Sequence, residues 1–145
     1  PYTTLFRSLH WNHNQGNLST EKSYEGAQSY RLGEFSGSFE YPLDSISIPN
    51  EGHLFIISKL YYNSSDKTDA GIVISLENGE GIYLWKNHKV NKYLHAYSNW
   101  WPVKYELRLQ KEEIKENSLL KIYLWNPSKV PAYIDNFEVE LIKIN

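Results

Sequence analysis

The sequence contains neither cysteine nor methionine among its 145 residues. Without cysteine the chain forms no disulfide and no thiolate zinc site. This absence suits a cytosolic protein and also a bacterial export that manages without disulfides, and it does not separate the two. Because a natural chain starts with Met, a first residue other than Met predicts a mature or excised piece of a longer protein.

The sequence also lacks an excess of charge of one sign and long apolar runs. Its 15 Lys and Arg and 17 Asp and Glu give a formal net charge of -2 and are spread evenly. Such a chain has no basic patch, which argues against nucleic-acid binding. No apolar run approaches the roughly 20 residues that span a bilayer, so we expect no direct membrane insertion.

The motifs of several enzyme classes are missing as well. There is no G-x-S-x-G elbow, no Cys nucleophile and no G-x-x-x-x-G-K phosphate loop. Glycoside hydrolysis needs two carboxylates held across a cleft. The acidic residues here fall mostly on polar phases of predicted strands or in the charged segment 110–118. The sequence therefore predicts a protein that is not an enzyme.

Aromatic residues, by contrast, are abundant and make up 15% of the chain, with 12 Tyr, 5 Trp and 5 Phe. An excess of Tyr and Trp over Phe indicates that several rings keep a polar edge in water. Sugar-binding and protein-binding faces use aromatic residues in this way. The other interpretation is an aromatic-rich core.

Apolar and polar residues alternate along much of the chain with the period of two that β-strands require. The clearest case is 101–109, where Trp101 and four further apolar residues alternate with charged ones, and residues 78–81, Asn-Gly-Glu-Gly, form the strongest hairpin turn. Roughly eight short strands without a long helix predict an all-β fold, an antiparallel two-sheet β-sandwich or jelly roll. We expect one such module over residues 1–145, with 1–22 as an irregular N-terminal segment.

The last stretch of the chain contains two further alternating segments, 119–126 and 132–144. Pro127 and Pro131 bracket the short loop between them and cannot donate ladder hydrogen bonds. This arrangement predicts that the second segment returns antiparallel to the first as a closing hairpin.

The second of these segments contains one break in its alternation. Ile134 is out of phase with Phe137, Val139 and Leu141, which alternate with solvent-facing Glu138 and Glu140. A β-bulge near residues 135–136 would turn both Ile134 and Phe137 inward and would re-aim the carboxylate of Asp135.

At the residue level, two motifs of this chain resemble galactose-binding-domain-like jelly rolls. One is the order of an aromatic strand, Trp125-Asn126, a short Pro-bearing loop, Tyr133-Ile134-Asp135 and an alternating final strand. The other is the segment 23–32, SYEGAQSYRL, which is similar to the entry into the second strand of that family. Many carbohydrate-binding modules of bacterial surface and secreted proteins have this fold.

The resemblance implies a non-catalytic carbohydrate-binding module that holds a glycan or polysaccharide. Such a module would belong to a larger extracytoplasmic bacterial protein, and the remainder of that parent chain would be its covalent neighbour. One alternative is a structural or protein-binding accessory domain of the same fold without a sugar ligand. A third reading is a small jelly-roll enzyme that degrades polysaccharides.

The residues themselves suggest where a glycan would bind. Tyr83 and Trp85 share one phase of a predicted strand, and Tyr123 and Trp125 share the corresponding phase of another. If these strands are neighbours, four rings lie on a single face. Sugars stack on such rings, and flanking side chains could bond the hydroxyl groups. These flanking residues are Lys86, Asn87, His88 and Asn126. Alternatively, the N-terminal segment or the loop 87–99 covers the rings and makes them a minor core.

The resemblance also implies a metal ion, because galactose-binding-like modules often hold a structural calcium. Asp135 would then supply the carboxylate, and carbonyl groups around residues 17–25 and the side chain of Glu21 would complete an all-oxygen site. The other interpretation is that Asp135 caps backbone N–H groups at the bulge without any ion.

Overall fold

The structure is a computed structural model and describes residues 2–6, 11–12, 18–19 and 29–144. Within these residues the strands follow one another without a long helix between them. In chain order they are β1 (Tyr2–Phe6), β2 (Trp11–Asn12), β3 (Leu18–Ser19), β4 (Ser29–Leu32), β5 (Ser38–Pro42), β6 (His53–Ser64), β7 (Gly71–Asn78), β8 (Gly81–Lys89), β9 (Trp100–Gln110), β10 (Leu119–Trp125) and β11 (Ala132–Ile144).

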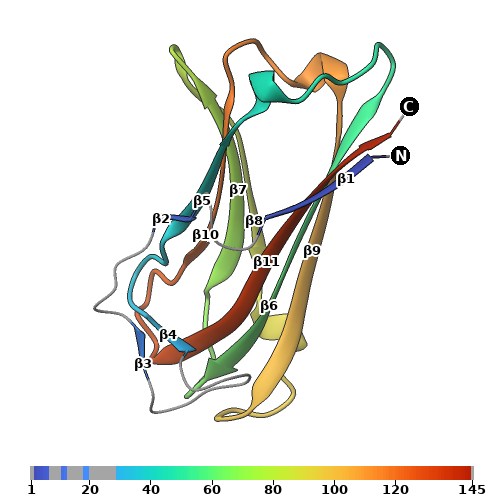
Figure 1. Ribbon diagram of the computed structural model, residues 1–145. Helices are drawn as coiled ribbons and strands as arrows, with labels where there is room; N and C mark the ends of the chain where they lie inside the picture. Colours follow the sequence, from blue (N-terminus) through green and yellow to red (C-terminus); the bar gives the residue numbers. More distant parts are fainter. Residues whose placement is uncertain (1, 7–10, 13–17, 20–28, 145) are drawn as a thin grey trace.

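The strands form two sheets that face each other (Figure 1). The six-stranded sheet has the order β3-β4-β11-β6-β9, and β1 also pairs with β11. The five-stranded sheet has the order β2-β5-β10-β7-β8. Every strand pairing in the described part of the chain is antiparallel. The prediction of an all-β antiparallel sandwich is confirmed.

From β4 onward the chain crosses between the sheets at almost every connection. Only β7 and β8 are consecutive in one sheet, and the predicted turn joins them as a hairpin. In that turn Asn78 Oδ1 accepts a hydrogen bond of 2.9 Å from the Glu80 N–H, and Gly81 has a φ of 117° that favours glycine. Crossing connections of this kind give the jelly roll its topology.

The core lies between the inner faces of the two sheets. On β10 the buried side chains are Leu120, Ile122 and Leu124, none of which has exposed surface, and the residues between them are half-buried. Burial of each such aliphatic side chain stabilises the fold by about 1.5–3 kcal/mol. β7 differs because six consecutive residues from Gly71 are buried, so this strand is covered on both faces.

The predicted closing hairpin is wrong. β10 belongs to the five-stranded sheet and β11 to the six-stranded sheet, so the two strands are not hydrogen-bonded neighbours (Figure 1). The link 126–131 crosses from one sheet to the other. Two strands that each have a buried face can meet through those faces as well as along their edges, and alternation alone does not distinguish the two arrangements.

The predicted bulge in the last strand is confirmed. The register between β11 and β6 shifts between Asp135 and Glu138, and Asn136 has a φ of 54°. Ile134 is buried and Phe137 packs against the core, as expected. Glu138 was expected to face solvent but is only 6% exposed, and its carboxylate lies 3.4 Å from Lys59 Nζ.

The N-terminal segment 1–22 was expected to be irregular, yet its described parts form strands. β1 pairs with β11, β2 with β5 and β3 with β4. The alternation in these short pieces is too brief to be recognised in the sequence.

No helix within the described residues is long and apolar enough to cross a membrane.

The side chain of Asn126 holds the link between β10 and β11 in place. It is fully buried, and its Nδ2 donates hydrogen bonds to the carbonyl oxygens of Gly33 (3.2 Å) and Val130 (2.9 Å). Its backbone N–H donates to the Glu34 carbonyl at 2.6 Å. These bonds join the link after β10 to the link between β4 and β5, which also crosses between the sheets.

The substitution Asn126→Ala removes the buried amide that donates to the carbonyl groups of Gly33 and Val130, and the loss of each such hydrogen bond costs about 0.5–1.5 kcal/mol. We expect the free energy of unfolding, measured in urea, to fall by at least that amount. Asn99→Ala is the matched control, because Asn99 is exposed and its amide reaches only the Tyr97 carbonyl. Equal losses in the two variants would contradict the role of Asn126.

A cluster of rings joins the sheets where β8 approaches β9. The His88 ring stacks on Tyr105 with centroids 4.3 Å apart and planes at 1°. The Tyr93 hydroxyl donates to the Lys104 carbonyl at 2.6 Å, so it accepts from His88 Nε2, also at 2.6 Å. Burial, followed by the nearby charge of Lys92, lowers the pKa of His88.

The lowered pKa of His88 makes folding stability depend on pH. The unfolded chain takes up this proton first as the pH falls through about 6.5, so stability is full above that pH and decreases below it. We expect His88→Gln to reduce the slope of unfolding free energy between about pH 7 and pH 5. His95→Gln, at an exposed ring, is the control, and an unchanged slope in His88→Gln would contradict the assignment.

Candidate functional site

The outer face of the five-stranded sheet carries the candidate site. On β10 the core residues alternate with Lys121, Tyr123 and Trp125, which therefore face outward. The register of β10 and β7 places Tyr123 opposite Val73 and Trp125 opposite Gly71. Outward side chains of β10 thus project directly beside those of β7.

The edge strand β8 continues this outer face. Trp85 lies opposite Ser75 of β7, and Asn87 lies opposite Val73. At the other side of β10, Phe35 forms an isolated bridge with Trp125. The outward positions therefore run from the link before β5, across β10 and β7, to the sheet edge at β8.

Four rings lie on this surface, which we call the aromatic face: Phe35, Trp85, Tyr123 and Trp125. Trp85 and Trp125 pack edge to face with centroids 5.8 Å apart, and Phe35 and Tyr123 do so at 6.1 Å. Trp85 is 45% exposed and Phe35 is 51% exposed, whereas the other two rings are half-buried. The aromatic face is therefore open to solvent in part.

The half-buried members of the aromatic face cover the outer side of β7. Val73 has no exposed surface, although it points away from the main core and does not belong to it. It lies between Tyr123 and Asn87 in the register. The rings therefore form a thin second apolar layer over Val73 and still present ring surface to solvent.

A row of charged side chains borders the aromatic face. Lys121 Nζ lies 2.7 Å from a carboxylate oxygen of Glu77 and 3.7 Å from one of Glu40. Hydrogen bonding to Glu77, followed by its charge and then that of Glu40, raises the pKa of Lys121. Lys121 and Trp85 both lie opposite Ser75, so these polar groups are next to the exposed ring.

Of the eight residues expected to contact a ligand, the structure brings Trp85, Asn87, Tyr123 and Trp125 together and separates Tyr83. The register of the hairpin shifts beside Tyr83, which is an extra residue in β8. Its hydroxyl contacts Ser118 Oγ and accepts a hydrogen bond from the Lys115 N–H at 3.1 Å. The phase shared with Trp85 in the sequence is therefore lost in the structure.

Lys86 and Asn126 are also separated from the aromatic face. Lys86 lies opposite the core residue Ile74, so it projects from the opposite face of β8 to Trp85. Asn126 is fully buried and its amide is bonded to two carbonyl groups. The fourth flanking residue, His88, has the same phase as Lys86 and is held by Tyr105 and Tyr93.

Phe35 was not predicted as a site residue. The sequence places it in one alternating strand with Phe39, yet Phe39 is fully buried and Phe35 is half-exposed on the outer face. The strand begins only at Ser38, and the turn-forming residues before it break the alternation. Ser36-Gly37 is the one signal in the sequence that could have indicated this change of face.

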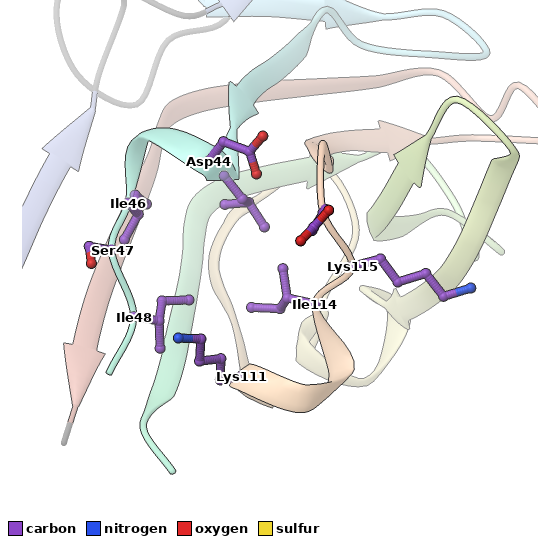
Figure 2. Close-up of a pocket in the computed structure, with 9 residues that line it drawn as sticks. Asp44, Ile46, Ser47, Ile48, Lys111, Ile114 and Lys115 are labelled. Atoms are coloured by element: carbon purple, nitrogen blue, oxygen red, sulfur yellow. The ribbon is translucent and has the colours of Figure 1, made fainter. Parts of the chain in front are cut away.

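A separate hollow of about 260 Å³ lies at one end of the sandwich, between the link from β5 to β6 and the link from β9 to β10 (Figure 2). Aliphatic residues that include Leu43 and Ile114 line it, together with the acidic residues Asp44 and Glu116. Asp44 Oδ1 accepts a hydrogen bond from the Asn117 N–H at 3.2 Å, which ties the two links together. Because no described lining residue is aromatic, this hollow offers no ring for stacking.

The predicted calcium site falls largely outside the described residues. Glu21 and most of the segment 17–25 belong to the part of the chain that the structure does not describe. Asp135 Oδ1 accepts a hydrogen bond of 2.8 Å from the Asn136 N–H, as expected for a cap at the bulge. Within the described ranges no three His, Asp or Glu side chains gather that could hold a metal ion.

Comparison with known proteins relates this chain to solved structures only, since no family model and no curated protein matches it. One similar structure is the CBM22-1 xylan-binding domain from Paenibacillus barcinonensis Xyn10C. It has 18% sequence identity and a TM-score of 0.51, and the match covers 97% of this chain and 93% of that domain.

Two other similar structures come from viruses. The structure of the infectious bursal disease virus Gt strain has a TM-score of 0.56 at 11% identity, over 100% of this chain and 33% of that one. Tailspike protein 4 of Bacteriophage CBA120 has a TM-score of 0.52 at 8% identity, over 97% of this chain and 19% of that one. These likenesses establish the fold: this protein is a β-sandwich of the jelly-roll type.

Proposed function

We propose that this domain is a non-catalytic carbohydrate-binding module that holds a glycan on the aromatic face. The observation that carries the proposal is the half-exposed ring of Trp85, packed edge to face against Trp125 on a sheet whose other face is fixed in the core. Sugar rings have apolar faces of C–H groups that stack on such side chains. The similar domain from Paenibacillus barcinonensis is described as xylan-binding, which agrees with this assignment.

The polar groups around the aromatic face suit a ligand with many hydroxyl groups. Asn87 carries both a donor and an acceptor, and Lys121 with Glu77 and Glu40 places charged donors and acceptors beside Trp85. Lys121 is already paired with two carboxylates, so these three groups together carry one net negative charge and suit an uncharged ligand more than an acidic one.

The proposal extends to the setting of the domain. Following the resemblance to bacterial carbohydrate-binding modules, we place it in a larger extracytoplasmic protein whose other parts carry the activity that the glycan serves. The domain itself would then hold the glycan without chemistry. The aromatic face fits this role, because its charged neighbours form ion pairs rather than two carboxylates facing each other across a cleft.

A second candidate function is protein binding by the same surface. Ile82 is 62% exposed on β8, at the outward position immediately before Trp85, and an aliphatic side chain contributes little to sugar stacking. An apolar and aromatic patch of this kind also suits a protein partner. Direct measurement of glycan binding separates the two functions.

We expect Trp85→Ala to lower the affinity for a glycan by about tenfold, which corresponds to roughly 1.4 kcal/mol. The variant removes stacking surface from a folded sheet, and nearly half of the ring is exposed, so the melting temperature should change little. A glycan array followed by isothermal titration with the best binder measures the first effect, and thermal unfolding measures the second.

Trp101→Ala is the matched control for this experiment. Trp101 lies on β9 of the other sheet, is half-buried, and donates a hydrogen bond of 2.8 Å from Nε1 to the Ala96 carbonyl. Its loss should reduce stability and leave glycan binding unchanged. If Trp85→Ala unfolds as early as Trp101→Ala while glycan binding persists, the aromatic face is structural and the proposed function is wrong.

We further propose, from the resemblance alone, that Asp135 and Glu21 help to hold one structural calcium ion. A bound ion stabilises the folded state by mass action, so calcium should raise the melting temperature and EDTA should lower it. An unchanged melting temperature in EDTA would leave Asp135 as a cap of the bulge only.

A further inference from the structure

Two polar atoms under the aromatic face are buried without a hydrogen-bond partner among the described residues. They are the indole Nε1 of Trp125 and the amide Oδ1 of Asn87. Buried polar groups are nearly always paired, because an unpaired one loses its bonds to water and gains nothing in return. These two unpaired atoms therefore need an explanation, and one of them is a donor while the other is an acceptor.

Both residues adjoin the same glycine of β7. Gly71 is the cross-strand partner of Trp125, and a Cβ at Gly71 would lie only 1.8 Å from Asn87 Oδ1. The absence of a side chain at this position allows the Asn87 amide to lie over β7, next to the Trp125 ring. Glycine permits such a close approach where any other residue would displace its neighbour.

We propose that Asn87 and Trp125 form a hydroxyl-reading pair at the base of the aromatic face, and that they set its specificity. This inference rests on the proposed function. One ligand hydroxyl donates its proton to Asn87 Oδ1 and accepts the proton of the Trp125 indole. A hydroxyl group fits because it is both donor and acceptor, whereas a carboxylate only accepts and an ammonium group only donates.

The exposed ring of Trp85 controls access to the pair. It packs against Trp125 and lies two residues before Asn87 on the same face of the edge strand β8. Both polar atoms are buried in the structure. Movement of the Trp85 ring as a sugar stacks on it brings a hydroxyl within reach, so that stacking and hydroxyl recognition occur together.

The pair discriminates against ligands that lack the matching hydroxyl. A site with buried polar groups rejects an analogue that leaves those groups unpaired more strongly than an apolar pocket rejects a smaller ligand. We expect a strong preference for one neutral sugar over its deoxy or acidic counterpart. The aromatic rings alone would bind the face of many sugars with little discrimination.

The test uses Asn87→Leu and Trp125→Phe, with Asn99→Leu as a matched control at an exposed site on the loop before β9. Asn87→Leu keeps the approximate volume and removes the acceptor, and Trp125→Phe keeps a ring and removes the N–H. Each variant is titrated with xylohexaose, cellohexaose and laminarihexaose, and its thermal unfolding is recorded. Gly71→Ala is a further variant, in which the added methyl displaces the Asn87 side chain.

We expect Asn87→Leu, Trp125→Phe and Gly71→Ala each to lose at least tenfold in affinity for whichever oligosaccharide the unsubstituted domain binds. The melting temperature of Asn87→Leu should stay the same or rise, since replacement of an unpaired buried polar group by an apolar one of similar shape is neutral or stabilising. On saturation with that oligosaccharide, the indole N–H resonance that Trp125→Phe removes should shift in nitrogen–proton correlation spectra.

The possible failures are distinguishable. If the unsubstituted domain and Trp85→Ala both bind none of the three oligosaccharides, the proposed function fails and this inference fails with it. If Trp85→Ala loses binding while Asn87→Leu and Trp125→Phe bind as the unsubstituted domain does, the proposed function stands and the assignment of the hydroxyl-reading pair is wrong. A lower melting temperature in Asn87→Leu but not in Asn99→Leu would show a structural partner for Asn87 and would also overturn the pair.

Discussion

The buried amide of Asn126 is the constraint on which the last third of the chain depends. It holds the link between β10 and β11 against the link between β4 and β5, so that both cross between the sheets at the same place. Trp125 immediately precedes it, and Phe35 bridges to Trp125 beside it. The same hydrogen bonds that send β11 into the second sheet therefore also position two rings of the aromatic face.

The five-stranded sheet uses both of its faces, and this explains how a stable sheet can carry a binding surface. Its inner face supplies aliphatic residues to the core, as on β10. Its outer face carries a thinner layer in which Tyr123 and Asn87 cover Val73 while Trp85 remains half-exposed. Ring positions are thus fixed by packing from below, and fixed rings lose less freedom when a ligand stacks on them.

The fold alone leaves the function open. Similar sandwiches occur in a domain described as xylan-binding, in a virus structure and in a phage tailspike, all at low sequence identity. Function in such folds depends on the residues of one surface rather than on the topology. The aromatic face and the polar groups around it, rather than the topology, therefore support the proposed glycan ligand.

The sequence by itself determined most of the longer strands, the buried face of strands such as β10, the hairpin turn at 78–81 and the bulge beside Asp135, because each of these is a local consequence of period-two alternation and turn chemistry. It also indicated Trp85, Asn87, Tyr123 and Trp125. Tertiary structure decided the partners of each strand: β11 joined the other sheet, and an extra residue in β8 removed Tyr83 from the face. Alternation records that a side chain is buried, but not which layer buries it, and only the packed sheets determine that.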